Sequence, residues 1–233
     1  AVDRVSFAVQ QGEFIGVMGA SGSGKTTLLN LLSTIDRVTA GHIYYGDTDI
    51  TELGEEQLSE FRKKQLGFIF QEYNLLDTLT LEENIMLVMT LHRRGKKEIQ
   101  KRCRELLRIL GIEEVKDKYP YQVSGGQKQR CACARALANY PTLLLADEPT
   151  GALDSLAAQT LLETFTEMNK NMGATILMVT HDAFSASYCS RILFLKDGRI
   201  FHELVRGEKE RRAFLNEILD VMTLTGGERS HDV

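Results

Sequence analysis

Residues 14–27 decide the fold and read Phe14-Ile15-Gly16-Val17-Met18-Gly19-Ala20-Ser21-Gly22-Ser23-Gly24-Lys25-Thr26-Thr27. The apolar run 14–18 precedes the glycine-rich segment and a helical pattern over 28–35 follows it, so that segment joins a predicted strand to a predicted helix. In this context the glycines leave backbone N–H groups free to face phosphates. Lys25 is expected to reach the β- and γ-phosphate oxygens, and the Thr26 hydroxyl to ligate Mg²⁺. Residues 19–27 therefore predict a site for a nucleoside triphosphate.

The composition is that of a globular protein, with 233 residues, 43% hydrophobic and 26% charged. This length fits one large core with a subdomain, or two small domains. A net charge of -4 gives no overall attraction to nucleic acid or anionic lipid, so nucleic acid is disfavoured as a partner. The apolar runs are far shorter than the roughly 20 residues of a membrane-spanning helix, so we expect another chain to span any membrane involved.

The cysteines are few and scattered, and we predict neither a metal site nor a disulfide framework among Cys103, Cys131, Cys133 and Cys189. The small number and scattered positions of the cysteines fit a protein of the reducing cytosol. The sequence shows no signal peptide and begins without a methionine, almost directly on the strand-like segment 5–9. We therefore expect further residues upstream of Ala1.

Short apolar runs alternate with helical patterns, which is typical of a parallel sheet covered by helices, and the predicted class is α/β. The runs span 14–18, 66–70, 143–146 and 176–179. Each run is followed by polar groups, in order the phosphate loop, Gln71, Asp147 with Glu148, and His181. Ligands of open α/β sheets bind at the carboxyl ends of the strands. We therefore expect four separate regions to deliver these groups into one crevice around one triphosphate.

Between residues 71 and 124 apolar residues follow helical spacing and no strand-like run occurs, which predicts a helical insertion into the sheet domain. Its basic stretch over 93–104 could meet acidic headgroups or a partner, although a solvated helix face is the simpler interpretation. We assign no function to it.

Other segments predict antiparallel strands: 5–9, 42–45, and the pair 191–195 and 199–201 that an Asp-Gly turn joins. An amphipathic helix follows Gly207 and is expected to end near 226–227 and to pack back on the domain.

A second predicted phosphate site begins at Ser124, where Ser124-Gly125-Gly126-Gln127 opens a helical run that Pro141 ends. Ser with Gln three residues later is a capping box, which is the simplest interpretation. The two glycines also leave the first-turn N–H groups bare, and such a helix N-terminus binds anions. One chain then carries two phosphate-binding helix starts, which either bind two ligands or share one ligand across two copies of the chain.

In order, the motifs resemble those of ABC ATPases over almost the whole chain. The phosphate loop resembles Walker A, Gln71 the Q-loop, 123–127 the signature, 143–149 Walker B, 153–154 the D-loop and His181 the H-loop. Two mild departures are Val123 in place of the commoner Leu and Ala20 in place of a frequent Pro. The aromatic residue that stacks on adenine in this family should precede Val5 and is not found in this sequence.

The resemblance implies one ABC ATPase domain with a P-loop NTPase fold over 1–233. A RecA-like core with a mostly parallel sheet and an antiparallel β subdomain would take 1–71 and 141–206. A helical subdomain that includes the signature would take 72–140, and a C-terminal helix 207–226. Two chains would pack head to tail, so that Ser124, Gly125, Gly126 and Gln127 of one contact the γ-phosphate held by residues 19–27 of the other.

The resemblance also assigns roles. Glu148 is the base that deprotonates the attacking water, His181 contacts the γ-phosphate, and Lys25 completes the catalytic set. Mg²⁺ is held by Thr26, Gln71 and Asp147, and Asp154 caps its helix while it faces the opposing site. The simpler alternatives are a turn residue at Asp147, a capping acid at Glu148 and a structural histidine at His181.

Segment 71–77 resembles the segment on which a permease helix docks in this family. If Tyr73, Leu75 and Leu76 are exposed they form an interaction patch, and the alternative is an ordinary surface loop. The chain is similar to the branch of MacB-type and lipoprotein-release systems, and within it to the BceA-like ATPases of bacitracin-resistance modules. That resemblance implies ATP and Mg²⁺ as cofactors, a second copy and a membrane permease as partners, and a membrane sensor histidine kinase reached through the permease. It implies a place on the cytoplasmic face of the membrane.

Two rival functions stay open at this point. One is an ABC ATPase that acts on nucleic acid or ribosomes, and the other a cell-division-type regulator that binds ATP to signal. The nucleic-acid relatives usually carry a long coiled-coil insertion or two fused ATPase domains, neither of which occurs here. The transported substrate, the stoichiometry and the direction of coupling do not follow from the residues.

Overall fold

The structure is a computed structural model, and it describes residues 2–226. The strands within that range are β1 (Phe14–Met18), β2 (Tyr44–Tyr45), β3 (Thr48–Asp49), β4 (Leu66–Ile69), β5 (Leu143–Asp147), β6 (Ile176–Thr180), β7 (Arg191–Lys196) and β8 (Arg199–Val205). The α-helices are α1 (Lys25–Leu32), α2 (Glu55–Gln65), α3 (Leu81–Leu91), α4 (Lys96–Ile109), α5 (Gly125–Leu137), α6 (Ser155–Met172), α7 (Ala183–Ala186) and α8 (Arg211–Gly226). Single 3₁₀ turns occupy Ile50–Glu52, Glu113–Val115 and Pro120–Gln122.

Six strands form one sheet in the order β4-β5-β6-β1-β7-β8. All neighbours are parallel except β7 and β8, which form the hairpin that the Asp-Gly turn predicts. β2 and β3 form a separate antiparallel pair. The prediction of an α/β fold with a mostly parallel sheet is confirmed.

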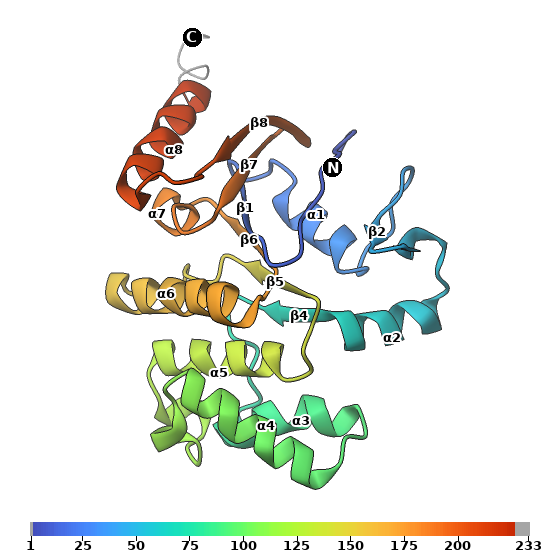
Figure 1. The fold of residues 1–233 in the computed structure, drawn as a ribbon, viewed down its shortest axis with the longest axis vertical. Helices are drawn as coiled ribbons and strands as arrows, with labels where there is room; N and C mark the ends of the chain where they lie inside the picture. Colours follow the sequence, from blue (N-terminus) through green and yellow to red (C-terminus); the bar gives the residue numbers. More distant parts are fainter. Residues whose placement is uncertain (1, 227–233) are drawn as a thin grey trace.

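The central strands are apolar on both faces because both faces are covered by other elements. Along β1, Phe14 and Met18 face one core cluster, while Ile15 and Val17 face a second one. α1 packs on the second cluster through Leu28 and Leu29, whereas α3 to α8 cover the first. The phosphate-loop helix and the signature-like helix α5 therefore lie on opposite faces of the sheet, and Figure 1 shows α5 with α3 and α4 at the far end from α8.

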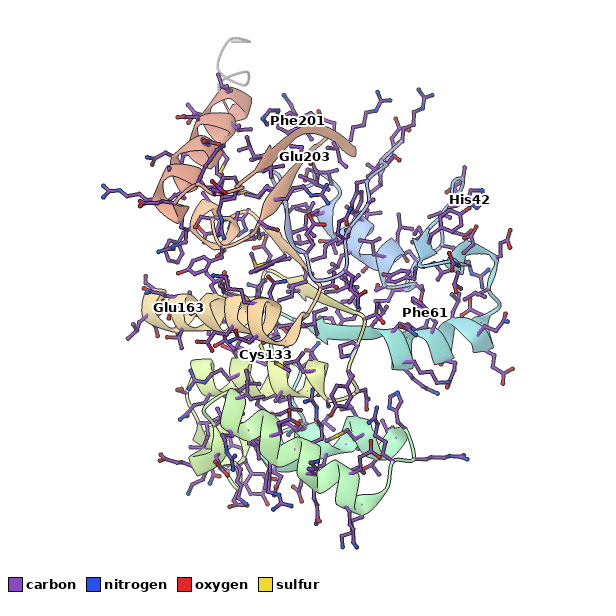
Figure 2. All side chains as sticks on the ribbon, in the orientation of Figure 1. His42, Phe61, Cys133, Glu163, Phe201 and Glu203 are labelled. Carbon is purple, nitrogen blue, oxygen red and sulfur yellow. The ribbon has the colours of Figure 1, made fainter. Side chains whose placement is uncertain are left out.

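The predicted helical insertion contains no strand among the described residues. α3 and α4 pack on α5 through apolar side chains at helical spacing, namely Leu81, Ile85, Met89, Ile99, Cys103, Leu106 and Leu107. Figure 2 shows Cys133 where α5 faces α6. All four cysteines are buried free thiols, and burial raises their pKa values, to about 12 for Cys103 and Cys131.

The prediction of a strand over 5–9 is wrong. Val5, Phe7 and Val9 do alternate toward the second core cluster, but their backbone joins no ladder and residues 5–9 are not a strand. The alternation of apolar residues indicates which side chains pack against the core, but it does not indicate whether the backbone pairs with another strand. Boundaries also differ: the first helix begins at Lys25, before the predicted apolar run, and the strand predicted over 42–45 is reduced to Tyr44–Tyr45.

The C-terminal helix packs back on the domain as predicted, because Phe214 and Ile218 are fully buried in the first core cluster. Residue 227 lies outside the described residues, so only the helix end at Gly226 can be compared with the prediction. Within 2–226 no helix combines the length and the apolar character that crossing a membrane requires.

Candidate functional site

The loop between β1 and α1 is a tight cradle. Gly22 and Gly24 have φ of 81° and 105°, values that favour glycine. A Cβ on Gly19 would lie 2.2 Å from the backbone oxygen of Leu195, so no side chain fits there. The first turn of α1 has no capping side chain and no acidic residue. The loop thus presents bare backbone to a ligand at a helix N-terminus, where anions are favoured.

Donor groups in this cradle fit a polyphosphate. The Lys25 ammonium donates to the Gly19 and Ala20 carbonyl oxygens at 2.8 and 3.1 Å, which holds its charge over the loop. The buried Ser23 hydroxyl has no hydrogen-bond partner. A buried polar atom without a partner costs free energy unless a ligand satisfies it. The cradle therefore supplies a cation, open amides and an unsatisfied hydroxyl to a single anionic ligand.

The end of β5 places Asp147 beside this loop. Partial burial raises the pKa of its carboxyl, the adjacent Glu148 raises that pKa further, and the Lys25 ammonium lowers it. The Thr26 hydroxyl stands on the exposed first turn of α1. Carboxylate and hydroxyl oxygens are ligands that suit Mg²⁺. A desolvated carboxylate beside a triphosphate cradle has the chemistry of a magnesium ligand.

Glu148 and His181 form a direct pair. Glu148 has φ of 43°, uncommon for a residue with a side chain, and its carboxylate lies 2.8 Å from His181 Nδ1. The Thr180 hydroxyl donates to the same carboxylate at 3.2 Å. When the carboxylate is ionised, the hydrogen must sit on Nδ1, which leaves Nε2 of the exposed imidazole available to a ligand. The ends of β5 and β6 thus hold a carboxylate and an imidazole in one fixed arrangement.

Gln71, just after β4, reaches toward the loop that follows Glu148. Its amide nitrogen lies 2.7 Å from the Cβ position of Gly151, so only glycine leaves room for it. Gln71 after β4 therefore lies against the loop that follows β5, and Glu148 at the end of β5 meets His181 after β6.

Ser124 caps α5 with the predicted capping box: its hydroxyl accepts from the Gln127 N–H, and the Gln127 side-chain oxygen accepts from the Ser124 N–H. Asp154 caps α6 by accepting from the Ala157 N–H at 2.9 Å. Ser124, Gly125 and Gly126 line one open groove together with Asp154 and Arg130.

None of the residues that line this groove belongs to the 19–27 loop. Within the described chain, the second predicted anion site is therefore separate from the first predicted one. The first comprises Gly19, Ala20, Ser21, Gly22, Ser23, Gly24, Lys25, Thr26 and Thr27.

Three residues that contribute to the site were not predicted from the sequence. Thr180 orients Glu148, Gly151 makes room for Gln71, and Arg135 of α5 holds the loop after Gln71. Thr180 has a detectable signal, because a polar residue ends an apolar run directly before His181. Arg135 has a weaker one, a single cation within the small-residue run 131–138.

We expect Asp147→Asn to stabilise the nucleotide-free protein at pH 7 by a few degrees in Tm at most. Because its pKa is raised on folding, the Asp147 carboxylate destabilises the folded state wherever it is ionised. The difference between variant and parent should vanish below the ordinary pKa of 3.8, where Asp147 is protonated in both states, and reach its full size above the raised value. Thermal melts in EDTA across pH measure this. A parent that is the more stable protein at pH 7 would contradict it, and Asp77→Asn in an exposed loop is the control.

Comparison with known proteins gives consistent matches. The ABC transporter family profile matches residues 2–151. The bacitracin export ATP-binding protein BceA of Halalkalibacterium halodurans is 50% identical over 96% of this chain and 88% of its own length. The macrolide export ATP-binding/permease protein MacB of Syntrophobacter fumaroxidans is 42% identical over 84% of this chain and 28% of its own length.

Among solved structures, the dimeric ABC transporter cassette MJ0796 of Methanocaldococcus jannaschii superposes with a TM-score of 0.79 at 39% identity, and covers 88% of this chain and 90% of the other. A second structure of that cassette is described as a dimeric post-hydrolysis state bound to ADP and Pi.

Proposed function

The chain belongs to the ABC transporter family, and on that premise we propose that it hydrolyses ATP to drive a membrane permease that protects against bacitracin-like peptide antibiotics. The pairing of Glu148 with His181 at the end of the sheet carries the hydrolytic part of this proposal. The export part is supported by the similarity to the bacitracin export protein BceA and the macrolide export protein MacB. A MacB-type or lipoprotein-release role is the second candidate within the same branch.

The chemistry follows from the arrangement of the site. Glu148, held by Thr180 and His181, takes a proton from the attacking water. In its doubly protonated form, His181 donates through Nδ1 to Glu148 and through Nε2 to the γ-phosphate, and Lys25 neutralises charge on the β- and γ-oxygens. Thr26, Gln71 and Asp147 would hold Mg²⁺, which neutralises phosphate charge when bound.

Two copies of the chain complete the site. The separation of the Ser124 groove from the 19–27 loop supports a head-to-tail pair in which each loop meets the groove of the other copy. The dimeric form of the similar MJ0796 cassette supports the same assembly. In this arrangement Gly125, Gly126 and Gln127 contact the γ-phosphate across the interface, and Asp154 faces it.

The permease would dock beside the loop that follows Gln71. Leu76 is 49% exposed, and buried Asn84 fixes it by accepting from the Leu76 N–H and donating to the Leu76, Leu79 and Thr80 carbonyls. Leu75, by contrast, packs against the first core cluster. The predicted patch of Tyr73, Leu75 and Leu76 is therefore reduced, because Tyr73 and Leu75 are partly buried and only Leu76 is exposed. Leu76 is the apolar anchor available to a partner.

We propose a location at the cytoplasmic face of the membrane through this permease, with a sensor histidine kinase reached through it. We also propose that residues 72–140 form a helical subdomain between the core parts 1–71 and 141–206, with 207–226 as a C-terminal helix. The packing of α3 and α4 on α5 supports this division.

We expect Leu76→Asp to prevent co-purification of the permease from membranes while the free subunit keeps its ATPase activity. Loss of a central apolar anchor commonly costs about 2 kcal/mol or more at an interface, and a buried carboxylate adds to that cost. Pull-down of the permease and ATPase assays of the free subunit measure the two effects.

Leu219→Asp on α8 is the matched control, because Leu219 is 45% exposed and lies far along the chain from this loop. It should leave docking intact. If Leu76→Asp still co-purifies and cells stay resistant to bacitracin, this loop is not the docking surface. If cells that lack this chain stay resistant to bacitracin but release lipoproteins poorly, the MacB-type or lipoprotein-release role is favoured instead.

A further inference from the structure

The loop after Gln71 has an unusual backbone. Tyr73 and Asn74 have φ of 61° and 50°, and two consecutive side-chain-bearing residues in this region are costly unless the surroundings impose them. Their two carbonyl groups consequently point toward one donor, the guanidinium of Arg135. That guanidinium donates to the Tyr73 oxygen at 2.9 Å and also to the Asn74 oxygen.

Arg135 belongs to α5, the helix that begins with the Ser124 anion site. Burial lowers the pKa of the guanidinium, so its charge is held here at a desolvation cost that the two carbonyl bonds offset. A planar guanidinium can hold two oxygens at once, which a lysine cannot do with the same geometry.

A second contact joins the loop to the start of the same helix. The Tyr73 hydroxyl lies 3.0 Å from the Cβ position of Gly125, so Tyr73 lies against the first turn of α5. Arginine side chains in helices extend toward the N-terminus, which lets Arg135 reach a loop that also touches Gly125. The loop is therefore attached to α5 at two places.

The opposite end of the loop is held differently. Asn84 of α3 bonds both the N–H and the carbonyl of Leu76. The exposed Leu76 is thus fixed to α3, whereas Tyr73 and Asn74 are fixed to α5.

We propose that Arg135 is a positioning residue that fastens Tyr73 and Asn74 to α5, so that a displacement of the loop moves the Ser124–Gly126 anion site with it. This inference rests on the proposed function. In this proposal the Arg135 side chain links the Tyr73–Asn74 end of the loop to the Ser124–Gly126 segment, which must meet the phosphate loop of the other copy.

Hydrogen exchange tests the local link. In Arg135→Gln the amides of Tyr73 and Asn74, which bond Phe70 and Glu72 oxygens, should exchange about tenfold faster, the effect expected for loss of a hydrogen bond to a charged group. The Leu76 amide should be unchanged, because Asn84 still holds it.

Arg102→Gln is the matched control. Arg102 is also buried and also donates to a backbone oxygen of the helical part, that of Leu137, but it does not touch the loop. Equal acceleration of the Tyr73 amide in both variants would overturn the link, since general loosening would then explain it.

The functional test is ATP-dependent dimer formation in a Glu148→Gln background, measured as the dimer dissociation constant. We expect Arg135→Gln to raise that constant at least tenfold, Arg135→Lys to raise it a few-fold through one retained carbonyl bond, and Arg102→Gln to leave it within twofold. If Glu148→Gln alone does not dimerise, the proposed function itself fails and the inference falls with it. If Glu148→Gln dimerises and Arg135→Gln dimerises equally well, only the inference is overturned.

Discussion

Glu148→Gln should lower steady-state ATP hydrolysis by roughly 10²- to 10⁴-fold, the usual contribution of a positioned general base. Glutamine keeps the size of the side chain and can still accept from the Thr180 hydroxyl, so the local fold should survive. It cannot take a proton from water. Phosphate release measured at saturating ATP and Mg²⁺ gives the rate, and binding of a fluorescent ATP analogue should stay within a few-fold of the parent.

Glu163→Gln on α6 is the control for charge removal, because Glu163 is exposed and its carboxylate accepts from Gln159 within the same helix. It should leave the rate unchanged. A Glu148→Gln rate within a few-fold of the parent would reject Glu148 as the base and leave the His181 pair without a catalytic explanation.

Ser124→Arg should reduce hydrolysis by more than about 10²-fold, the size of effect seen when one group that stabilises transition-state charge is lost. The arginine side chain fills the groove that Gly125 and Gly126 leave open. Binding of ATP to the 19–27 loop should persist, because no residue of that loop lines the groove. Phosphate release and analogue binding, measured on the same preparation, separate the two effects.

Ser124→Ala is the companion variant. It removes the cap of α5, at a cost of about 1 kcal/mol in stability, and leaves the groove open. We expect hydrolysis within about tenfold of the parent. If both variants were equally inactive, the capping role alone would explain the loss and the groove would need no ligand.

Sequence reasoning anticipated most of the site because its groups stand at strand ends and helix starts. Asp147, Glu148 and His181 follow buried apolar runs, and the parallel sheet brings those ends together. Ser124 and Asp154 precede helices with the expected spacing, and both cap them. These signals are local, so a single sequence carries them.

The remaining features depend on contacts between distant segments. Arg135 and Tyr73 are 62 residues apart, and no local pattern indicates that the guanidinium meets that carbonyl. Leu75 is partly buried by packing against the core, although Asn74 and Leu76 on either side of it are exposed. The prediction of a strand over 5–9 is wrong for a related reason. The alternation of apolar and polar residues is a local pattern, whereas a strand also needs a neighbouring strand with which to form hydrogen bonds.

The central claim is that one ATP lies between the 19–27 loop of one copy and the Ser124 groove of another. Light scattering on Glu148→Gln, with and without ATP and Mg²⁺, tests it most directly, because blocked hydrolysis should trap the closed pair. The account predicts twice the mass of one chain with ATP, the mass of one chain without it, and the mass of one chain under both conditions when Ser124→Arg is added. Equal dimer content in Glu148→Gln and Glu148→Gln/Ser124→Arg would contradict the shared site.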